Sequence, residues 1–250
     1  MLKLSQKKTT EFEYAFGTLI SDMFERISDE ANLKSTKDEH ARGNKPDGKT
    51  QAYVCIHLPA TSFVQAMLEA LNHLTPRYET HERYGYPSKV QTPFKFLDVG
   101  CGVGQKVYMA QRLFEHIEAF GLELRPEHVQ IARETLTKYM MNHRNSCELS
   151  FKDENIIQDN AITFNRYSEF DIIYFYCPSS DDKTEIELER SIARGAKVGA
   201  VVVGALSKYF GQPNFVNEVQ SLGWRLIQDT VERCRVWKRV SAAEHTDFCI

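Results

Sequence analysis

The first third of the chain carries apolar residues at helical spacing, interrupted by polar stretches. Residues 9–32 predict a helix with one apolar face, and the polar residues 29–50 predict a loop that overlaps its end. A second helix is predicted over residues 60–74, and the turn-rich, aromatic residues 77–93 predict another loop. Because two helices with one apolar face each cannot bury enough surface alone, we expect residues 1–93 to pack on the rest of the chain as a helical extension and lid. An ordinary disordered loop over residues 29–50 is the alternative to a lid.

From residue 94 the pattern becomes a regular alternation of short apolar runs and amphipathic segments. Apolar runs of this length indicate strands, and the segments between them indicate helices. The strands are expected at 95–99, 119–124, within 149–158, 170–176, 197–206, 224–230 and 234–240, with helices at 105–116, 126–141, 183–194 and 213–222.

This alternation predicts a parallel sheet with helices on both faces. The connection at residues 231–233 is too short for a helical crossover, so the last two strands are expected to form an antiparallel hairpin. The predicted fold is therefore an α/β protein, a three-layer α/β/α sandwich with a mostly parallel seven-stranded sheet over residues 94–250.

A glycine-rich segment joins the first of these strands to its helix. It reads Phe-Leu-Asp-Val-Gly-Cys-Gly-Val-Gly-Gln over residues 96–105. Glycines there allow a sharp turn and close approach of a ligand to the backbone, although a tight turn with incidental glycines is the simpler alternative. Gln105 replaces the third glycine of a dinucleotide fingerprint, and Val107 after Lys106 excludes a P-loop, so a phosphate-binding loop is disfavoured.

Two acidic residues follow neighbouring strands of this region. Asp98 lies at the end of the first strand, where a carboxylate suits a cation better than a pyrophosphate. Glu123 ends the second strand, and its carboxylate can accept two hydrogen bonds from a ribose diol. A ligand with a ribose, a positive charge and no phosphate fits both acids, and S-adenosylmethionine (SAM) is such a ligand.

Residues 94–240 resemble the class I SAM-dependent methyltransferases. The motifs that carry the resemblance are residues 96–105, Gly-Leu-Glu-Leu at 121–124 and Ile-Gln-Asp-Asn-Ala at 157–161. The resemblance implies that Asp98 lies near the methionine amino group, Glu123 holds the ribose and Asp159 approaches the adenine. An Asx-turn after the strand is the alternative for Asp159. The cofactor-binding set that it implies is Asp98, Gly100, Cys101, Gly102, Gly104, Gln105, Glu123, Leu124, Asp159 and Asn160.

A finer resemblance concerns the acceptor. Gly-Val-Gly-Gln at 102–105 before a strand that ends in Glu is similar to the non-SET histone-lysine methyltransferases and their bacterial relatives. The stretch Tyr-Val-Cys-Ile-His-Leu-Pro-Ala at 53–60 looks like a degraded form of a segment that lies beside the cofactor in that group. The resemblance implies a protein side chain, with a lysine-type amine favoured, or a small metabolite as the methyl acceptor.

The end of the fourth strand is the expected acceptor side. Tyr176 is predicted to line the acceptor pocket as the catalytic residue, with a packing role as the alternative. Residues 176–179, Tyr-Cys-Pro-Ser, lack the Asp/Asn-Pro-Pro-Tyr of amino-methylating DNA enzymes, so nucleic acid is an unfavoured acceptor. Cys177 is expected to be a small buried residue, Asp181 to belong to a solvated helix N-terminus, and His57 to be structural.

Composition sets the remaining bounds. The 250 residues include 31 Lys and Arg against 34 Asp and Glu, so the net charge of −3 gives no case for nonspecific nucleic-acid binding. The six cysteines form no zinc-type spacing, so no metal is expected, and no apolar run predicts a signal or a membrane span. A cytoplasmic protein with free thiols is expected. A noncatalytic SAM-fold module is the main alternative function, and a nicotinamide dehydrogenase is opposed by Gln105.

Overall fold

The computed structural model describes residues 59–83, 86–114, 116–141, 151–179, 181–229 and 234–241, together with Phe24 and Ile27. Phe24 and Ile27 are helical, and Phe24 is fully buried in the core. The other residues of the helix predicted over 9–32 lie outside the described part of the chain. So do the predicted loop at 29–50 and residues 53–58, which include His57.

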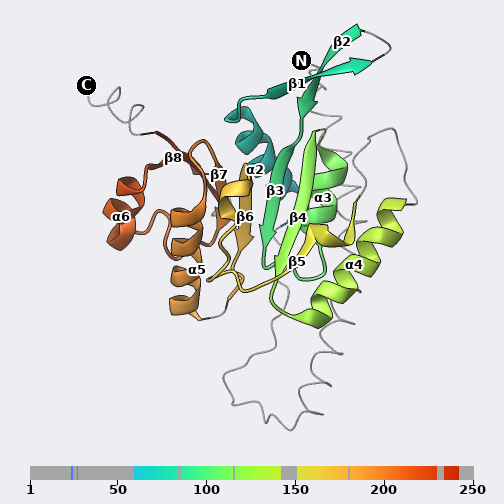
Figure 1. Cartoon of the computed structure of the whole chain (residues 1–250). Helices are drawn as coiled ribbons and strands as arrows, with labels where there is room; N and C mark the ends of the chain where they lie inside the picture. Colours follow the sequence, from blue (N-terminus) through green and yellow to red (C-terminus); the bar gives the residue numbers. More distant parts are fainter. Residues whose placement is uncertain are drawn as a thin grey trace, which may run out of the picture.

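Seven strands form one sheet in the order β5-β4-β3-β6-β7-β9-β8 (Figure 1). The strands β3 to β7 pair in parallel, and β9 lies antiparallel to both β7 and β8. The predicted fold class, with its closing antiparallel hairpin, is therefore confirmed. The strands are β3 (Phe94–Val99), β4 (Ile117–Glu123), β5 (Ile156–Gln158), β6 (Ile172–Tyr176), β7 (Val201–Ala205), β8 (Trp224–Asp229) and β9 (Cys234–Arg239).

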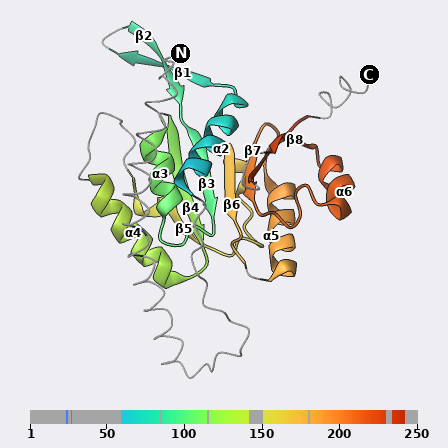
Figure 2. The ribbon, with the colours of Figure 1, turned by 180° about the vertical axis from the view of Figure 1, so that it is seen from behind.

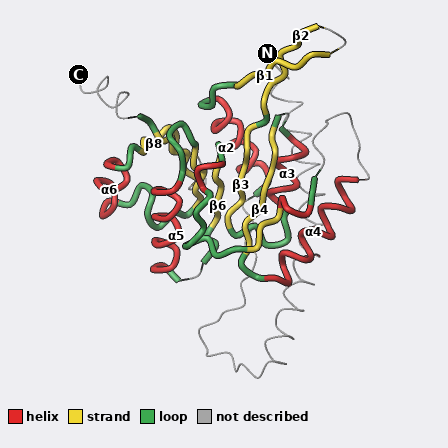
Figure 3. The backbone as a smooth tube through the Cα atoms, viewed as in Figure 1, coloured by secondary structure: helices red, strands yellow, loops and turns green. Residues whose placement is uncertain are grey.

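Helices cover both faces of the sheet, which makes three layers (Figures 2 and 3). One face packs against α2 (Ala60–Asn72), α3 (Gln105–Leu113) and α4 (Pro126–Met141), and the other against α5 (Asp182–Gly195) and α6 (Val216–Ser221). Short 3-10 turns at Asp153–Asn155, Tyr167–Glu169 and Pro213–Phe215 join the elements, so the single helix predicted over 213–222 is divided.

Successive residues of each strand point to opposite faces of the sheet and so belong to two different cores. On β3, Phe96 faces the α2–α3 side, whereas Leu97 and Val99 face the α5 side. Helix α2, from the N-terminal third, packs through Phe63 and Met67 into the first of these cores. The apolar residues of α2 therefore belong to the same core as the strands beneath it.

The prediction of a loop at residues 77–93 was wrong. Arg77–Arg83 (β1) and Tyr86–Thr92 (β2) form a two-stranded antiparallel ladder that projects beyond the sheet in Figure 1. The apolar pattern did not reveal it because backbone pairing, and not an alternating apolar face, defines this hairpin. Only Pro93 separates β2 from β3.

The strand order places a topological switch point between β3 and β6. From β3 the chain proceeds outward through β4 and β5, and then returns to the other side of β3 as β6. In open α/β sheets, the crevice beyond the carboxyl ends of the strands at such a point is where ligands bind.

Candidate functional site

The glycine loop leaves β3 at this switch point. Gly100 has a φ of 75°, and a Cβ on it would lie 2.6 Å from Cβ of Pro178, at the end of β6. Gly104 has a φ of 86° and is the N-cap of α3, where a Cβ would lie 2.8 Å from Cδ1 of Leu136 on α4. Both glycines are therefore required by backbone conformation and by close packing at the same time.

Asp98 lies at the base of this loop, with 4% of its surface exposed. Burial raises the pKa of its carboxyl from 3.8 to about 7. The positive charge of Lys106 opposes this rise in pKa, and the negative charge of Glu123 adds to it. Asp98 pairs in register with Tyr174 on β6, and Tyr174 lines the same cavity. The cavity wall at the end of β3 therefore carries a buried carboxyl group whose charged form is disfavoured by burial.

Glu123 connects the glycine loop to the next loop. Its Oε2 accepts a hydrogen bond from the backbone N–H of Gly102 at 2.9 Å, and its Oε1 accepts one from the N–H of Arg125 at 2.9 Å. His128 Nδ1 lies 4.0 Å from Glu123 Oε1, and burial lowers the pKa of this histidine. A neutral imidazole therefore lies beside the carboxylate at neutral pH.

Short-range hydrogen bonds from side chains to the backbone shape the loop after β5, at residues 159–162. Asp159 Oδ1 accepts from the N–H of Asn160 at 2.7 Å, and Asn160 Oδ1 accepts from the N–H of Ile162 at 2.9 Å. The loop contains an Asx-turn, but Asn160 makes it, so the turn proposed as the alternative role of Asp159 is not the one observed. Both residues line the cavity, and Leu124 lies at its mouth with 61% of its surface exposed.

The end of β6 forms the opposite wall. Tyr176 is partly buried, and Cys177 follows it with a φ of 42°, in the left-handed region that side chains with a Cβ rarely adopt. Burial, together with the charge of Glu185, raises the pKa of the Cys177 thiol. A neutral thiol is a weak nucleophile. Cys177 is only partly buried, so the expectation of a small buried residue holds only in part.

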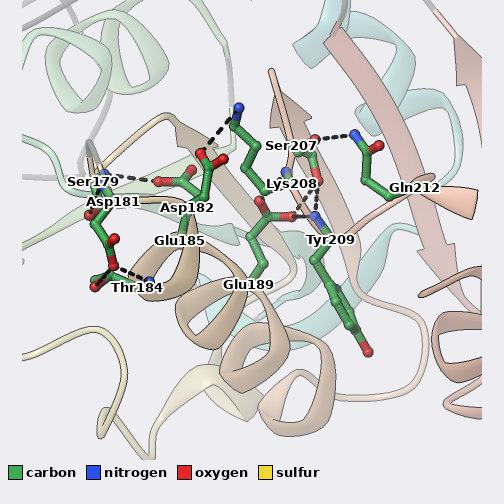
Figure 4. A network of polar contacts seen from close by, with 10 residues as sticks. All are labelled: Ser179, Asp181, Asp182, Thr184, Glu185, Glu189, Ser207, Lys208, Tyr209 and Gln212. Atoms are coloured by element: carbon green, nitrogen blue, oxygen red, sulfur yellow. Dashed lines mark hydrogen bonds and ion pairs between the residues drawn. The ribbon is translucent and has the colours of Figure 1, made fainter. Parts of the chain in front are cut away.

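Two buried glutamates of α5 hold the loops around this wall (Figure 4). Glu185 Oε2 accepts a hydrogen bond from the N–H of Ser179 at 2.9 Å, and burial raises the pKa of Glu185 to about 7. Glu189 is fully buried and accepts hydrogen bonds from the hydroxyl of Ser207 and from the backbone N–H groups of residues 208–210. The loops after β6 and β7 are thereby tied to one helix. Asp181 caps that helix by accepting from the N–H of Thr184.

One cavity brings these elements together, and every predicted cofactor-binding residue except Gly104 lines it, as does Tyr176. Gly104 instead caps α3 and packs on α4. The lining residues that the sequence did not reveal include Lys106, Arg125, His128, Ile162, Tyr174, Thr184 and Leu188. One sequence feature could have indicated that Lys106 is buried. Met109 and Ala110 follow it at i+3 and i+4, so Lys106 lies on the apolar face of the helix.

Several buried polar atoms in the cavity wall have no hydrogen-bond partner in the described part of the chain. They are both side-chain amide atoms of Gln105, Nε2 of His128 and the hydroxyl of Tyr174. Buried polar groups are nearly always paired, so unsatisfied ones facing a cavity indicate a polar ligand. Among the described residues, no group of His, Cys, Asp and Glu is arranged to hold a metal ion, and no helix is long and apolar enough to cross a membrane.

Comparisons with known proteins add only distant likenesses. No protein-family model and no curated protein matches the chain. It is similar to a solved structure of ribosomal protein L11 methylase from Lactobacillus delbrueckii subsp. bulgaricus, with 13% identity, 74% of this chain and 81% of that chain covered, and a TM-score of 0.49. It is also similar to an RNA methyltransferase from Salinibacter ruber in complex with S-adenosyl-L-homocysteine, with 15% identity, 73% and 91% covered, and a TM-score of 0.44.

A third similar structure is the O-MT segment of StiE, with 14% identity and a TM-score of 0.39. That match covers 54% of this chain and 46% of the StiE segment, so the chain spans less than half of that structure. Likenesses this distant do not assign an activity to this chain.

Proposed function

We propose that the protein is a class I SAM-dependent methyltransferase. The observation that carries the proposal is the acid pair Asp98 and Glu123, which lies at the carboxyl ends of two adjacent parallel strands in one cavity with the glycine loop. A carboxylate at the cation end and another at the ribose end complement an adenosyl sulfonium ligand that has no phosphate.

The other residues of the cavity fit this cofactor. Gly100 keeps the backbone open where any side chain would meet Pro178, and the buried amide of Gln105 offers a donor and an acceptor. Leu124, Asp159 and Asn160 would border the adenine, and Glu123 would bind the ribose hydroxyls. The cofactor, S-adenosyl-L-methionine, becomes S-adenosyl-L-homocysteine after transfer.

The acceptor that we propose is a protein side chain, with a lysine-type amine favoured, or a small metabolite. When bound, the cofactor supplies a methyl group activated by its sulfonium sulfur, so the protein mainly has to orient the acceptor and exclude water. We assign the acceptor wall to Tyr176, which lines the cavity at the end of β6. An amine acceptor must lose a proton before its lone pair can attack the methyl carbon.

The same cavity would serve a noncatalytic SAM-binding module, which is the alternative function. The unsatisfied Tyr174 hydroxyl and the ordered wall at 176–179 favour catalysis, because a module that only binds the cofactor has no use for an acceptor side. Cys101, Cys177 and Cys234, the cysteines in the described ranges, form no disulfide. We propose that the protein works in a reducing compartment such as the cytoplasm.

Two experiments test this proposal together. S-adenosylhomocysteine should raise the melting temperature whereas NAD should not, since a ligand at a hundredfold excess over Kd stabilises the native state by about 2.7 kcal/mol. Methyl-labelled SAM added to a lysate should then label the protein or small-molecule fraction in the presence of the enzyme.

Absence of a thermal shift with S-adenosylhomocysteine would contradict the proposal that SAM is the cofactor. Binding without label transfer would favour the noncatalytic module. Label in the nucleic-acid fraction would contradict the proposed acceptor.

A further inference from the structure

The wall formed by residues 176–179 at the end of β6 is held by contacts on two sides. On one side, Pro178 packs on the glycine loop so closely that a Cβ on Gly100 would lie 2.6 Å from its Cβ. On the other side, the backbone N–H of Ser179 donates a hydrogen bond of 2.9 Å to Oε2 of Glu185 on α5 (Figure 4). The 176–179 wall therefore connects the glycine loop to α5.

The backbone of this wall is strained at Cys177. Its φ of 42° lies in the left-handed region, where a residue with a Cβ remains only if the surrounding structure imposes that conformation. Ser179 follows two residues later, and its hydrogen bond to Glu185 fixes the chain on that side. Without an acceptor for this N–H, we expect the backbone of the 176–179 wall to relax away from its present conformation.

Glu185 lies outside the cavity, behind its wall. Its neighbours Thr184 and Leu188 line the cavity, whereas Glu185 exposes only 1% of its surface and accepts its hydrogen bond from the backbone of the wall. Glu189, one helical turn further, accepts hydrogen bonds from backbone N–H groups of the loop after β7 in the same way. One face of α5 thus carries two buried carboxyl groups that bind the backbones of two neighbouring loops.

Stability does not account for a carboxyl group at this position. Burial raises the pKa of Glu185 from 4.5 to about 7, and the negative charges of Glu189 and Asp182 add to the rise. The hydrogen bond from Ser179 and the positive charge of Lys208 oppose it. The other carboxyl oxygen, Oε1, has no hydrogen-bond partner in the described part of the chain. An apolar side chain of similar volume would be buried there at lower cost, so the carboxyl group requires another explanation.

We propose that Glu185 is a positioning residue for methyl transfer: by accepting the N–H of Ser179, it holds the 176–179 wall, and with it Tyr176, in place beside the glycine loop. The inference rests on the proposed function and deepens it by naming the residue that fixes the acceptor side. Glu185 acts through the wall and touches neither cofactor nor acceptor. Because in-line transfer requires close alignment of the acceptor with the methyl carbon, displacing the wall by about 1 Å should cost on the order of a hundredfold in rate.

Two substitutions at this one position separate the hydrogen bond from the charge. Glu185→Gln removes the charge, but its amide oxygen can still accept the N–H of Ser179. Glu185→Met keeps the length of the side chain and offers only a weak thioether acceptor. Glu187→Met, at an exposed position of the same helix, is the matched control. A thermal melt establishes that each variant is folded, and Glu185→Asp, whose side chain is one methylene shorter, replaces Glu185→Met if the latter does not fold.

The first measurement is the rate of label transfer from methyl-labelled SAM to the acceptor fraction of the lysate, at saturating amounts of that fraction. We expect Glu185→Met to transfer label about ten- to a hundredfold more slowly than Glu185→Gln. Glu185→Gln and Glu187→Met should keep the wild-type rate. Calorimetry should give the same affinity for S-adenosylhomocysteine in all four proteins, because Glu185 does not line the cavity.

The second measurement needs no acceptor. Iodoacetamide alkylates the thiol of Cys177, which is partly buried in the wall, and peptide mass spectrometry separates its signal from those of the other cysteines. Glu185→Gln and Glu185→Met both remove the negative charge that helps to raise the pKa of this thiol, so the charge affects both rates alike. We expect faster alkylation in Glu185→Met than in Glu185→Gln, because only the former releases the backbone of the wall.

The failure of this inference is distinguishable from failure of the proposed function. Wild-type protein that binds no S-adenosylhomocysteine, or that transfers no label, contradicts the proposed function. Label transfer by the wild type, with equal transfer rates or equal alkylation rates in Glu185→Met and Glu185→Gln, retains that function and overturns the positioning role. A loss of affinity for S-adenosylhomocysteine in Glu185→Met also overturns it, because Glu185 then acts on the cofactor side.

Discussion

Glu123 and Gly102 join the two central motifs of the site through one hydrogen bond, in which the carboxylate Oε2 accepts from the backbone N–H at 2.9 Å. They are separated by 21 residues in the sequence and belong to neighbouring strand ends. The acid thus sets the shape of the glycine loop as well as the charge of the cavity. A change at Glu123 should therefore affect the loop and the ligand together.

Glu123→Gln should weaken binding of S-adenosylhomocysteine by about ten- to a hundredfold, since hydrogen bonds to charged groups contribute roughly 1.5–3 kcal/mol. An amide nitrogen cannot accept the N–H bonds that both carboxylate oxygens now accept. Isothermal calorimetry measures the effect, and Glu118→Gln, at the other end of β4, is the control. Unchanged affinity in a folded Glu123→Gln variant would mean that the ribose does not bind there.

Gly100→Ala should destabilise the protein more than Gly199→Ala. Both positions have a positive φ, so each substitution costs about 1–2 kcal/mol of backbone strain. Only at Gly100 would the new Cβ overlap a neighbour, Cβ of Pro178 at 2.6 Å, whereas nothing lies within 4 Å at Gly199. The overlap should add roughly 1–3 kcal/mol. Urea unfolding compares the two variants, and equal losses would contradict the tight contact between the glycine loop and the end of β6.

Glu185 should make the protein less stable as the pH rises through 7. Its folded-state pKa is raised from 4.5 to about 7, so the folded chain holds this proton more tightly than the unfolded chain. The stabilisation is complete below the unfolded pKa and is lost as the pH rises through the folded pKa, with about 1.4 kcal/mol for each pKa unit.

Glu185→Gln imitates the protonated side chain and should remove this dependence on pH. The variant should be about 1–2 kcal/mol less stable than the wild type near pH 4.5, because of the unpaired buried amide, and about 1–2 kcal/mol more stable at pH 8, where the wild type carries a buried charge. Denaturant titrations at several pH values measure the difference, with Glu187→Gln at an exposed position of the same helix as the control. Parallel pH profiles for wild type and Glu185→Gln would contradict the raised pKa.

Tyr176→Phe should lower kcat about ten- to a hundredfold and leave the affinity for S-adenosylhomocysteine unchanged, because we propose that the lost hydroxyl faces the acceptor. Each 1.36 kcal/mol of lost transition-state stabilisation is tenfold in rate. Tyr78→Phe, on the exposed side of β1, is the control. The test requires the acceptor found by label transfer. A variant with normal kcat would assign Tyr176 to packing, the alternative reading of this residue.

The strands and helices after residue 94 were predictable because local chemistry specifies them. The strands β3 to β7 are short, mainly apolar runs, and β6 at the centre of the sheet is buried from Ile172 to Phe175. Gly195 and Gly223 end or follow helices as expected. The short connection before β9 required an antiparallel pair, whatever the rest of the fold. The sequence also predicted that Asp98 and Glu123 lie close together. Both are near the carboxyl ends of their strands, and parallel strands bring these ends to one edge of the sheet.

The tertiary structure decided what depends on contacts between distant residues. The β1–β2 hairpin has no apolar alternation in its sequence to reveal it, and only the antiparallel pairing of its two strands identifies it. Gly104 faces α4 and not the cavity, which follows from how two helices pack. Lys106 and Glu185 have ordinary local sequences, and only their burial, against α2 and the loop after β6, shifts the pKa of each. Burial is a property of the assembled layers, so no short stretch of sequence contains it.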